Sequence, residues 1–136
     1  MKRYIKSAVK PISDEDIATR DEVARDPETD LDILLGLSDD LEVRSAVATN
    51  PNLPLEYIIK FADDEAWYVR MAIARNPSTP ADILSKLSTD WHDAVRTVVA
   101  RNPNTSPETL INMTERDCDY IVRRDAKKNL ASRGIT

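Results

Sequence analysis

A Val-Arg dipeptide recurs along this 136-residue chain at nearly constant intervals, and this periodicity restricts the possible folds more than any other feature. The copies are Val43-Arg44, Val69-Arg70, Val95-Arg96 and Val122-Arg123, with Thr19-Arg20 as a weaker first copy. Their arginines are 24, 26, 26 and 27 residues apart. Repeats of this length are typical of proteins in which each copy is one small unit that stacks on its neighbours.

Six residues after each arginine stands a second recurring pair, which predicts where a helix ends. The pairs are Asp26-Pro27, Asn50-Pro51, Asn76-Pro77 and Asn102-Pro103, with Asn129-Leu130 in the last copy. Asparagine tolerates the left-handed conformation in which many helices end, and proline cannot continue a helix. We therefore expect each arginine-bearing helix to end at its Asn-Pro pair, with the asparagine left-handed.

The residues after each proline predict a second, shorter helix. Apolar residues recur seven and ten positions after the proline, as Leu34 and Leu37, Ile58 and Phe61, Leu84 and Leu87, and Leu110 and Met113. A threonine stands two positions after most of these prolines and an acid three positions later, as in Thr79 and Asp82. This spacing is close to a capping box, and Pro54 and Pro80 suit the first helical position. We expect this helix to have about eight residues.

The arginine-bearing helix also has one apolar face. Val69, Ala72 and Ile73 have the spacing of a helical face, and neighbouring copies repeat it. Because two short helices cannot bury such faces alone, the repeats must stack. The pattern predicts an all-α solenoid of about five two-helix repeats. Where the inner copies have Ala46, Ala72 and Val98, the first and last copies have Glu22 and Asp125, and we expect nothing to stack on these two residues.

These motifs resemble the leucine-rich repeat variant family, whose repeat runs roughly Asn-Pro-x-Thr-Pro, two leucines, an aspartate and Val-Arg-x-x-Val-Ala. The best-matching stretch contains Asn76-Pro77-Ser78-Thr79-Pro80, Leu84, Leu87, Asp90, Val95-Arg96 and Val99-Ala100. The resemblance covers residues 14–130 and implies a right-handed superhelix of paired short helices, with no common enzymatic activity. Some family members hold an iron–sulfur cluster on N-terminal cysteines, but this chain has one cysteine and is not expected to do so.

Charge is distributed unevenly over three expected parts of the chain. Residues 1–13 form a basic segment of net charge +4, residues 14–130 form the repeat domain, and residues 131–136 form a tail. Residues 121–136 are again net +4, so residues 14–120 carry −13 within a total of −5. Such a surface repels duplex nucleic acid and attracts a protein with a basic surface.

Neither membrane insertion nor secretion is expected. No apolar run approaches the length of about 18 residues that spans a membrane, and the N-terminus lacks the apolar core of a signal peptide. The single cysteine, Cys118, excludes an internal disulfide. We therefore expect a cytoplasmic protein.

An aspartate precedes most of the recurring arginines by six residues. The pairs are Asp14 and Arg20, Asp64 and Arg70, Asp90 and Arg96, and Asp117 and Arg123, while the second copy offers Asp39 or Asp40. Fixed offsets in stacked repeats predict a ladder of ion pairs between layers, as in the similar HEAT repeats. A carboxylate used for acid–base chemistry would have to differ from the others. None does, so we interpret the ladder as structural.

No residue pattern predicts a metal, a cofactor or a catalytic centre. His92 and Cys118 are the only residues of their kinds and belong to different repeats, whereas zinc needs three or four protein ligands. The sequence has no serine–histidine–aspartate order and no glycine-rich phosphate loop. We expect neither catalysis nor a small-molecule substrate.

The two tryptophans lead to different expectations. Trp91 aligns with Glu65, so it is either an exposed interface anchor or a buried residue that fills a gap. Trp67 aligns with Leu41 and Tyr120, and we expect it to pack.

Three positions of the arginine-bearing helix vary between copies, namely the second residue before the arginine and the first and fifth after it. Helical geometry places them within about 60° of one another, opposite the apolar face. We name this surface the variable band, and its main members are Tyr68, Met71, Arg75, Thr97, Arg101, Arg124 and Lys128. Because it varies on a regular scaffold, we expect the variable band, together with Trp91, to bind a partner.

The leading hypothesis is a non-catalytic protein-binding module, an adaptor or an inhibitor. In it, acidic residues at the corners between the helices (the acidic corners) steer a basic partner to the variable band. One alternative is nucleic-acid binding through a basic row, formed by Arg25, Arg75, Arg101, Arg124 and Lys128. A second is acidic mimicry of nucleic acid to block a basic protein. A third is an enzyme similar to DNA glycosylases built on HEAT-like repeats, with Trp91 and Asp93 at its site. The short, acidic chain argues against this third alternative.

Overall fold

The computed structural model describes residues 17–135, and all regular structure in this part of the chain is helical. Nine helices follow one another within it: α1 (Ile17–Arg25), α2 (Leu31–Leu37), α3 (Leu41–Ala48), α4 (Leu55–Phe61), α5 (Trp67–Arg75), α6 (Ala81–Leu87), α7 (Asp93–Arg101), α8 (Pro107–Arg116) and α9 (Tyr120–Ser132). The prediction of an all-α protein is therefore confirmed for the described residues. The basic segment 1–13 and Asp14 lie outside them.

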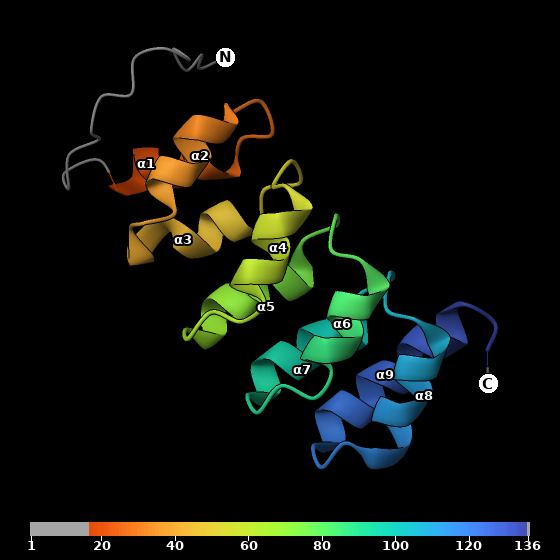
Figure 1. The fold of residues 1–136 in the computed structure, drawn as a ribbon. Helices are drawn as coiled ribbons and strands as arrows, with labels where there is room; N and C mark the ends of the chain where they lie inside the picture. Colours follow the sequence, from red (N-terminus) through yellow and green to blue (C-terminus); the bar gives the residue numbers. More distant parts are fainter. Residues whose placement is uncertain (1–16, 136) are drawn as a thin grey trace.

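The helices form a row in chain order. Each odd-numbered helix packs on the next odd-numbered one, from α1 to α9, and each even-numbered helix packs on the odd-numbered helix that follows it. Figure 1 shows α1 and α2 at one end of the row and α8 and α9 at the other. The loops that lead into α3, α5, α7 and α9 lie along one long edge of the molecule, which we name the loop edge (Figure 1).

The apolar face of the odd-numbered helices lies in the core. Val43, Val69, Val95 and Val122, which precede the recurring arginines, have no exposed surface. The even-numbered helices supply a second set of buried side chains: Leu34, Ile58, Leu84 and Leu110. Complete burial of one such side chain contributes about 1.5–3 kcal/mol. We call each odd-numbered helix, with the even-numbered helix packed on it, a layer of this row. The recurring apolar positions therefore hold the layers together.

The expectation of a left-handed asparagine is wrong. Asn76 has an extended backbone, with φ of −64°, and among the described residues only Gly134 has a positive φ. The buried Asn76 side chain instead joins two layers, because its Nδ2 donates to the carbonyl oxygens of Ala48 and Asn50 at 2.8 and 2.9 Å. Its Oδ1 accepts from the amide of Ser78 at 2.8 Å. The side-chain amide, and not a special backbone conformation, is what this position requires.

The same bridge recurs in the other layers. Asn50, Asn102 and Asn129 donate to main-chain carbonyls of the preceding layer over 2.7–2.9 Å. Asp26 occupies this position in α1's repeat and keeps only the acceptor half, since its Oδ1 accepts from the amide of Glu28 at 2.9 Å. We name Asn50, Asn76, Asn102 and Asn129 the asparagine ladder.

The expected capping box is also wrong. Thr79 donates its hydroxyl backward to the carbonyl of Ile73 in α5, at 2.6 Å, and Thr29 and Thr105 bond the preceding odd-numbered helix in the same way. The N-cap of α6 is Pro80, which makes no side-chain cap hydrogen bond. Each of these threonines stands four residues after the end of a helix, whose last carbonyls lack helical partners. They therefore end one helix and do not begin the next.

The arginines and aspartates pair between layers, and not within one repeat. The pairs are Arg20 and Asp40, Arg44 and Asp64, Arg70 and Asp90, and Arg96 and Asp117. Arg70 binds Asp90 through two nitrogens, at 2.7 and 3.1 Å, and also donates to the main-chain carbonyl of Asp64 at 2.7 Å. Oδ1 of Asp90 accepts from the His92 amide at 2.9 Å. Each such unit thus fixes a loop as well as the contact between two layers.

α9 is longer than the other helices of the described chain, with 13 residues. It continues past Asn129 and ends at Ser132, because the buried Leu130 stands where the other copies have a proline. Residues 131 and 132, expected in the tail, therefore belong to this helix.

Candidate protein interface

The variable band is only partly a free surface. Tyr68 and Met71 are half-buried and pack against the core, so the expectation that they face solvent without core contacts is wrong. Thr97 is also half-buried and donates to the main-chain carbonyl of Asp93 at 2.9 Å. Because an odd-numbered helix packs on each side of α5, the flanks of its apolar face are covered. Of the predicted group in α5, only Arg75 is exposed.

The exposed cations of the variable band line two adjoining hollows. The first has a volume of about 370 Å³ and is lined by Arg75, Val98 and Arg101, among others. The second has a volume of about 490 Å³ and is lined by Arg101, Arg124 and Lys128, among others. Arg101 belongs to both hollows, so these cations form one continuous basic surface.

Asp125 lies in the middle of this basic surface. It is only 6% exposed, so the expectation of a solvated polar residue at this position is wrong. Its carboxylate accepts from Nε of Arg101 at 2.8 Å and from Nη2 of Arg124 at 3.2 Å. Burial alone would raise the pKa of Asp125, but the hydrogen bonds and charges of Arg101 and Arg124 outweigh it and lower the pKa. A charged Asp125 therefore neutralises part of the basic row.

A second candidate surface lies on the loop edge, where α5 and α7 begin. Trp91 is 76% exposed, which decides between its two interpretations in favour of exposure. Trp67 stacks on His92 of the neighbouring layer, with ring centroids 4.2 Å apart and planes 9° apart. His92 in turn meets the Trp91 ring edge-on, with centroids 5.5 Å apart. Three rings from two layers thus form one aromatic cluster.

The position of Trp67 is not a buried one. Trp67 is 36% exposed despite its stacking, and Leu41 and Tyr120 at the same position of α3 and α9 are exposed as well. The expectation that Trp67 packs therefore holds only in part, because the ring stacks on His92 but stays exposed. The first residue of α3, α5 and α9 is therefore exposed at the loop edge, while the valine two positions later is buried.

Trp91 is held from one side by a buried cation. The guanidinium of Arg70 lies over its ring, 5.5 Å from the centroid. Arg70 is itself buried and bound to Asp90. The indole therefore rests on a fixed part of the scaffold, while most of its surface faces solvent.

Two hollows open beside Trp91. One has a volume of about 350 Å³ and is lined by Asp63, Glu65 and Lys86, among others. The other has a volume of about 310 Å³, and its lining includes Cys118. Asp63 is exposed and accepts from Nζ of Lys86 at 2.5 Å. The first hollow is therefore lined by carboxylates and by the Trp91 indole, together with the cations of Arg70 and Lys86.

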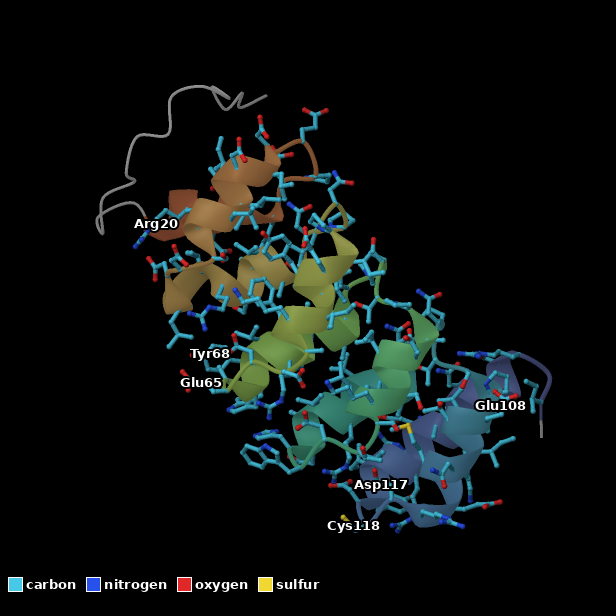
Figure 2. All side chains as sticks on the ribbon, in the orientation of Figure 1. Arg20, Glu65, Tyr68, Glu108, Asp117 and Cys118 are labelled. Atoms are coloured by element: carbon cyan, nitrogen blue, oxygen red, sulfur yellow. The ribbon has the colours of Figure 1, made fainter. Side chains whose placement is uncertain are left out.

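We name this surface the acidic–aromatic edge, formed by Asp63, Glu65, Trp67, Trp91, His92 and Asp93. Figure 2 shows Glu65 on the same long edge as Arg20 and Cys118, and Glu108 on the opposite side. Glu65 and Asp93 are both exposed. The acidic–aromatic edge thus combines a large apolar anchor with free negative charge.

The described residues offer no metal site, since no group of three or more histidine, cysteine, aspartate or glutamate side chains among them could hold an ion. Nδ1 of His92 accepts from the amide of Ala94 at 3.1 Å and caps α7. The exposed Cys118 lies 3.8 Å from a guanidinium nitrogen of Arg96. Neither residue shares a site with the other.

Sequence reasoning missed three features of the structure. These are the interlayer bonds of the asparagines, the stacking of Trp67 on His92, and the two arginines around Asp125. The recurrence of asparagine was itself a signal for the first, because a helix end alone does not require that residue type. The other two depend on which residues of adjacent layers face each other.

Known proteins give no further guidance, because no family model, no curated protein and no solved structure matches the chain. Among the described helices, none has both the length and the apolar character needed to cross a membrane.

Proposed function

We propose that the chain is a non-catalytic protein-binding module, built as a right-handed α-solenoid of about five repeats of 24–27 residues. Support for the architecture comes from the successive packing of α1, α3, α5, α7 and α9. The asparagine ladder and the arginine–aspartate pairs, which join each layer to the next, support it too. The resemblance to the leucine-rich repeat variant family favours the same architecture. Stacked repeats present long open surfaces that suit the binding of another protein.

The observation that carries the binding proposal is the exposure of Trp91. Tryptophan is enriched among the residues that dominate protein interfaces, and this one is supported by Arg70 and His92. The neighbouring carboxylates of Glu65 and Asp93 would attract a basic partner and raise its association rate. We therefore assign the main contact to the acidic–aromatic edge and a secondary contact to the exposed part of the variable band.

A non-catalytic role agrees with the way the interior carboxylates are engaged. Asp64, Asp90 and Asp117 each bind an arginine and a loop amide. A general base needs a carboxylate that can accept a proton from a substrate, and both oxygens of each of these three carboxylates already accept a hydrogen bond. Because a single exposed thiol suits a reducing compartment, we also propose a cytoplasmic location.

Nucleic acid is the weaker candidate. Binding to it depends on many cations that contact phosphates, and Asp125 neutralises part of the basic row between Arg101 and Arg124. Acidic mimicry of nucleic acid would also use the acidic–aromatic edge, but it gives no role to the exposed Trp91.

The proposal is tested by capturing partners from a lysate of the native host with three immobilised proteins. These are the unchanged chain, an edge variant with Glu65→Gln and Asp93→Asn, and a band variant with Arg75→Gln and Lys128→Gln. Each variant replaces two exposed charges by neutral groups. We expect a basic protein to bind the unchanged chain and to be retained about tenfold less by the edge variant, a difference of about 1.4 kcal/mol. The band variant should retain most of it.

Nuclease treatment of the lysate serves as the second arm. Loss of capture after this treatment would show that the chain binds nucleic acid and would overturn the proposal. Equal capture by the unchanged chain and the edge variant, with a loss confined to the band variant, would move the interface to the basic surface.

A further inference from the structure

We infer that the hollow between Trp91 and Asp63 receives an arginine side chain of the partner, an assignment that rests on the proposed protein-binding function. The hollow measures about 350 Å³, which is near the lower limit for ligand pockets. Its size suits one long side chain better than a folded element. Its rim carries the exposed carboxylates of Asp63 and Glu65.

The indole of Trp91 forms one wall of this hollow, which we name the arginine receptor. An aromatic ring attracts a cation over its face because the face carries partial negative charge. Arg70 already lies over the ring in this way, 5.5 Å from its centroid. Since the residue is 76% exposed, its ring has room for a second cation from the solvent side.

Lys86 acts as a competitor within the chain. Its ammonium group binds Asp63 at 2.5 Å, and both side chains are more than half exposed. Such a pair contributes little to stability, because water and salt screen it. It nevertheless shows that a cation fits beside Asp63, and an incoming side chain would have to displace it.

The geometry favours arginine over lysine. A guanidinium group is planar, stacks on an indole and binds a carboxylate through two parallel hydrogen bonds. The hollow is lined by an indole, by two exposed carboxylates and by the cations of Arg70 and Lys86, of which Arg70 is already bound to Asp90. An ammonium group is also attracted to the face of an indole, but it cannot stack flat on the ring or bind one carboxylate through two parallel hydrogen bonds.

The test uses a short glycine–serine peptide that carries two arginines, with lysine and citrulline versions of the same peptide. The chain has two tryptophans, so a nitrogen–proton correlation spectrum shows two indole N–H signals, which Trp67→Phe assigns. We expect the arginine peptide to shift the Trp91 signal saturably. The lysine peptide should bind about threefold more weakly or worse, and the uncharged citrulline peptide should cause no shift.

Two single variants separate local recognition from general attraction. Glu65→Gln and Asp93→Asn each remove one exposed carboxylate from the same edge, but only Glu65 lines the hollow. We expect Glu65→Gln to weaken binding of the arginine peptide about threefold and Asp93→Asn to weaken it by less than about 1.5-fold. Lys86→Met should tighten binding about twofold, because it removes the competing cation. Equal effects of the two carboxylate variants would overturn the assignment of this hollow to an arginine side chain. Equal binding of the arginine and lysine peptides would overturn it too.

The receptor and the proposed function can fail independently. Capture of the native partner by a Trp91→Ala variant at the level of the unchanged chain would exclude the receptor and a main contact at Trp91, but the protein-binding function itself would stand. Specific binding of the arginine peptide without any captured protein would contradict the proposed function and support the receptor. Helical circular dichroism of each variant ensures that the comparison concerns folded proteins.

Discussion

At the scale of single residues, the side-chain amide of Asn76 satisfies three main-chain groups that belong to two layers. A buried carbonyl or amide without a partner costs about 1–3 kcal/mol. Apolar residues can pack in several ways, whereas these groups accept only one arrangement of the two helices. The asparagine ladder therefore fixes the register between layers, and the valines supply most of the apolar attraction.

We expect Asn76→Ala to lower the free energy of unfolding by about 3 kcal/mol, because it leaves the carbonyls of Ala48 and Asn50 and the amide of Ser78 without this partner. Urea unfolding followed by circular dichroism measures the change. Asp26→Ala is the matched control, since Asp26 makes one exposed bond to Glu28, and it should cost less than about 1 kcal/mol. Similar losses in the two variants would show that the amide has no special role.

Asp125 gives stability a specific pH dependence. Its pKa in the folded chain is lowered, so it stabilises the fold above the ordinary aspartate pKa of about 3.9. This contribution is lost as the pH falls through the lower, folded-state value. Asp125→Asn should cost about 1 kcal/mol at pH 7, a modest value because Arg101 and Arg124 are partly solvated. The difference from the unchanged chain should shrink as the pH falls below about 4 in urea titrations, and a constant difference would contradict this account.

At the scale of helices, the turn after each odd-numbered helix is held by a threonine that points backward. Thr79 donates to Ile73 at 2.6 Å and is almost completely buried. The N-cap of α6, Pro80, makes no side-chain hydrogen bond to the helix. Only α8, among the even-numbered helices described, has a side chain that accepts from its first turn, with Ser106 bonded to the amide of Thr109 at 3.2 Å.

Thr79→Val should therefore weaken the end of α5 and not the start of α6. The variant keeps the shape of the side chain and removes one buried hydrogen bond, at a cost of about 1–2 kcal/mol. Hydrogen exchange should speed up at the amides of Ala74 and Asn76 more than at those of Ile83 and Leu84. The reverse pattern would restore the capping-box interpretation.

The sequence predicted the helix pairs because prolines and apolar spacings act within a single repeat. It did not predict the partners of Asn76 or Thr79, because these depend on the distance between layers and on the path of the turn. For the candidate interface, the acidic corners were foreseen from composition. The orientation of Trp91 was not, since its alignment with Glu65 says nothing about the neighbouring Arg70 and His92. The burial of Tyr68 was missed because the crowding of adjacent odd-numbered helices follows from three-dimensional packing.

At the scale of the whole molecule, every layer contacts mainly its neighbours. Stability in such an array is close to a sum of repeat terms and contacts between adjacent repeats. A change in an inner layer therefore weakens contacts on two sides, whereas a change near α9 weakens contacts on one side.

This difference predicts distinct effects for two core substitutions. Ile73→Ala, in the middle of the row, should lower the free energy of global unfolding by about 2–5 kcal/mol. Leu130→Ala, in α9, should mainly speed local hydrogen exchange in α8 and α9. Urea unfolding combined with residue-resolved exchange distinguishes these effects. Exchange that rises uniformly along the chain in Leu130→Ala would indicate one cooperative unit without independent layers.

The bonds between layers also determine how the chain reaches its fold. The arginine–aspartate pairs join residues 20 or 21 positions apart, and the asparagine ladder joins residues 24–29 positions apart. Closing a segment of this length has a modest entropic cost, and the cost is nearly the same for each layer. Chains with such short sequence separations between contacts fold quickly, on the timescale of helical proteins. During synthesis, each layer can thus dock on the one before it as soon as its own repeat has left the ribosome.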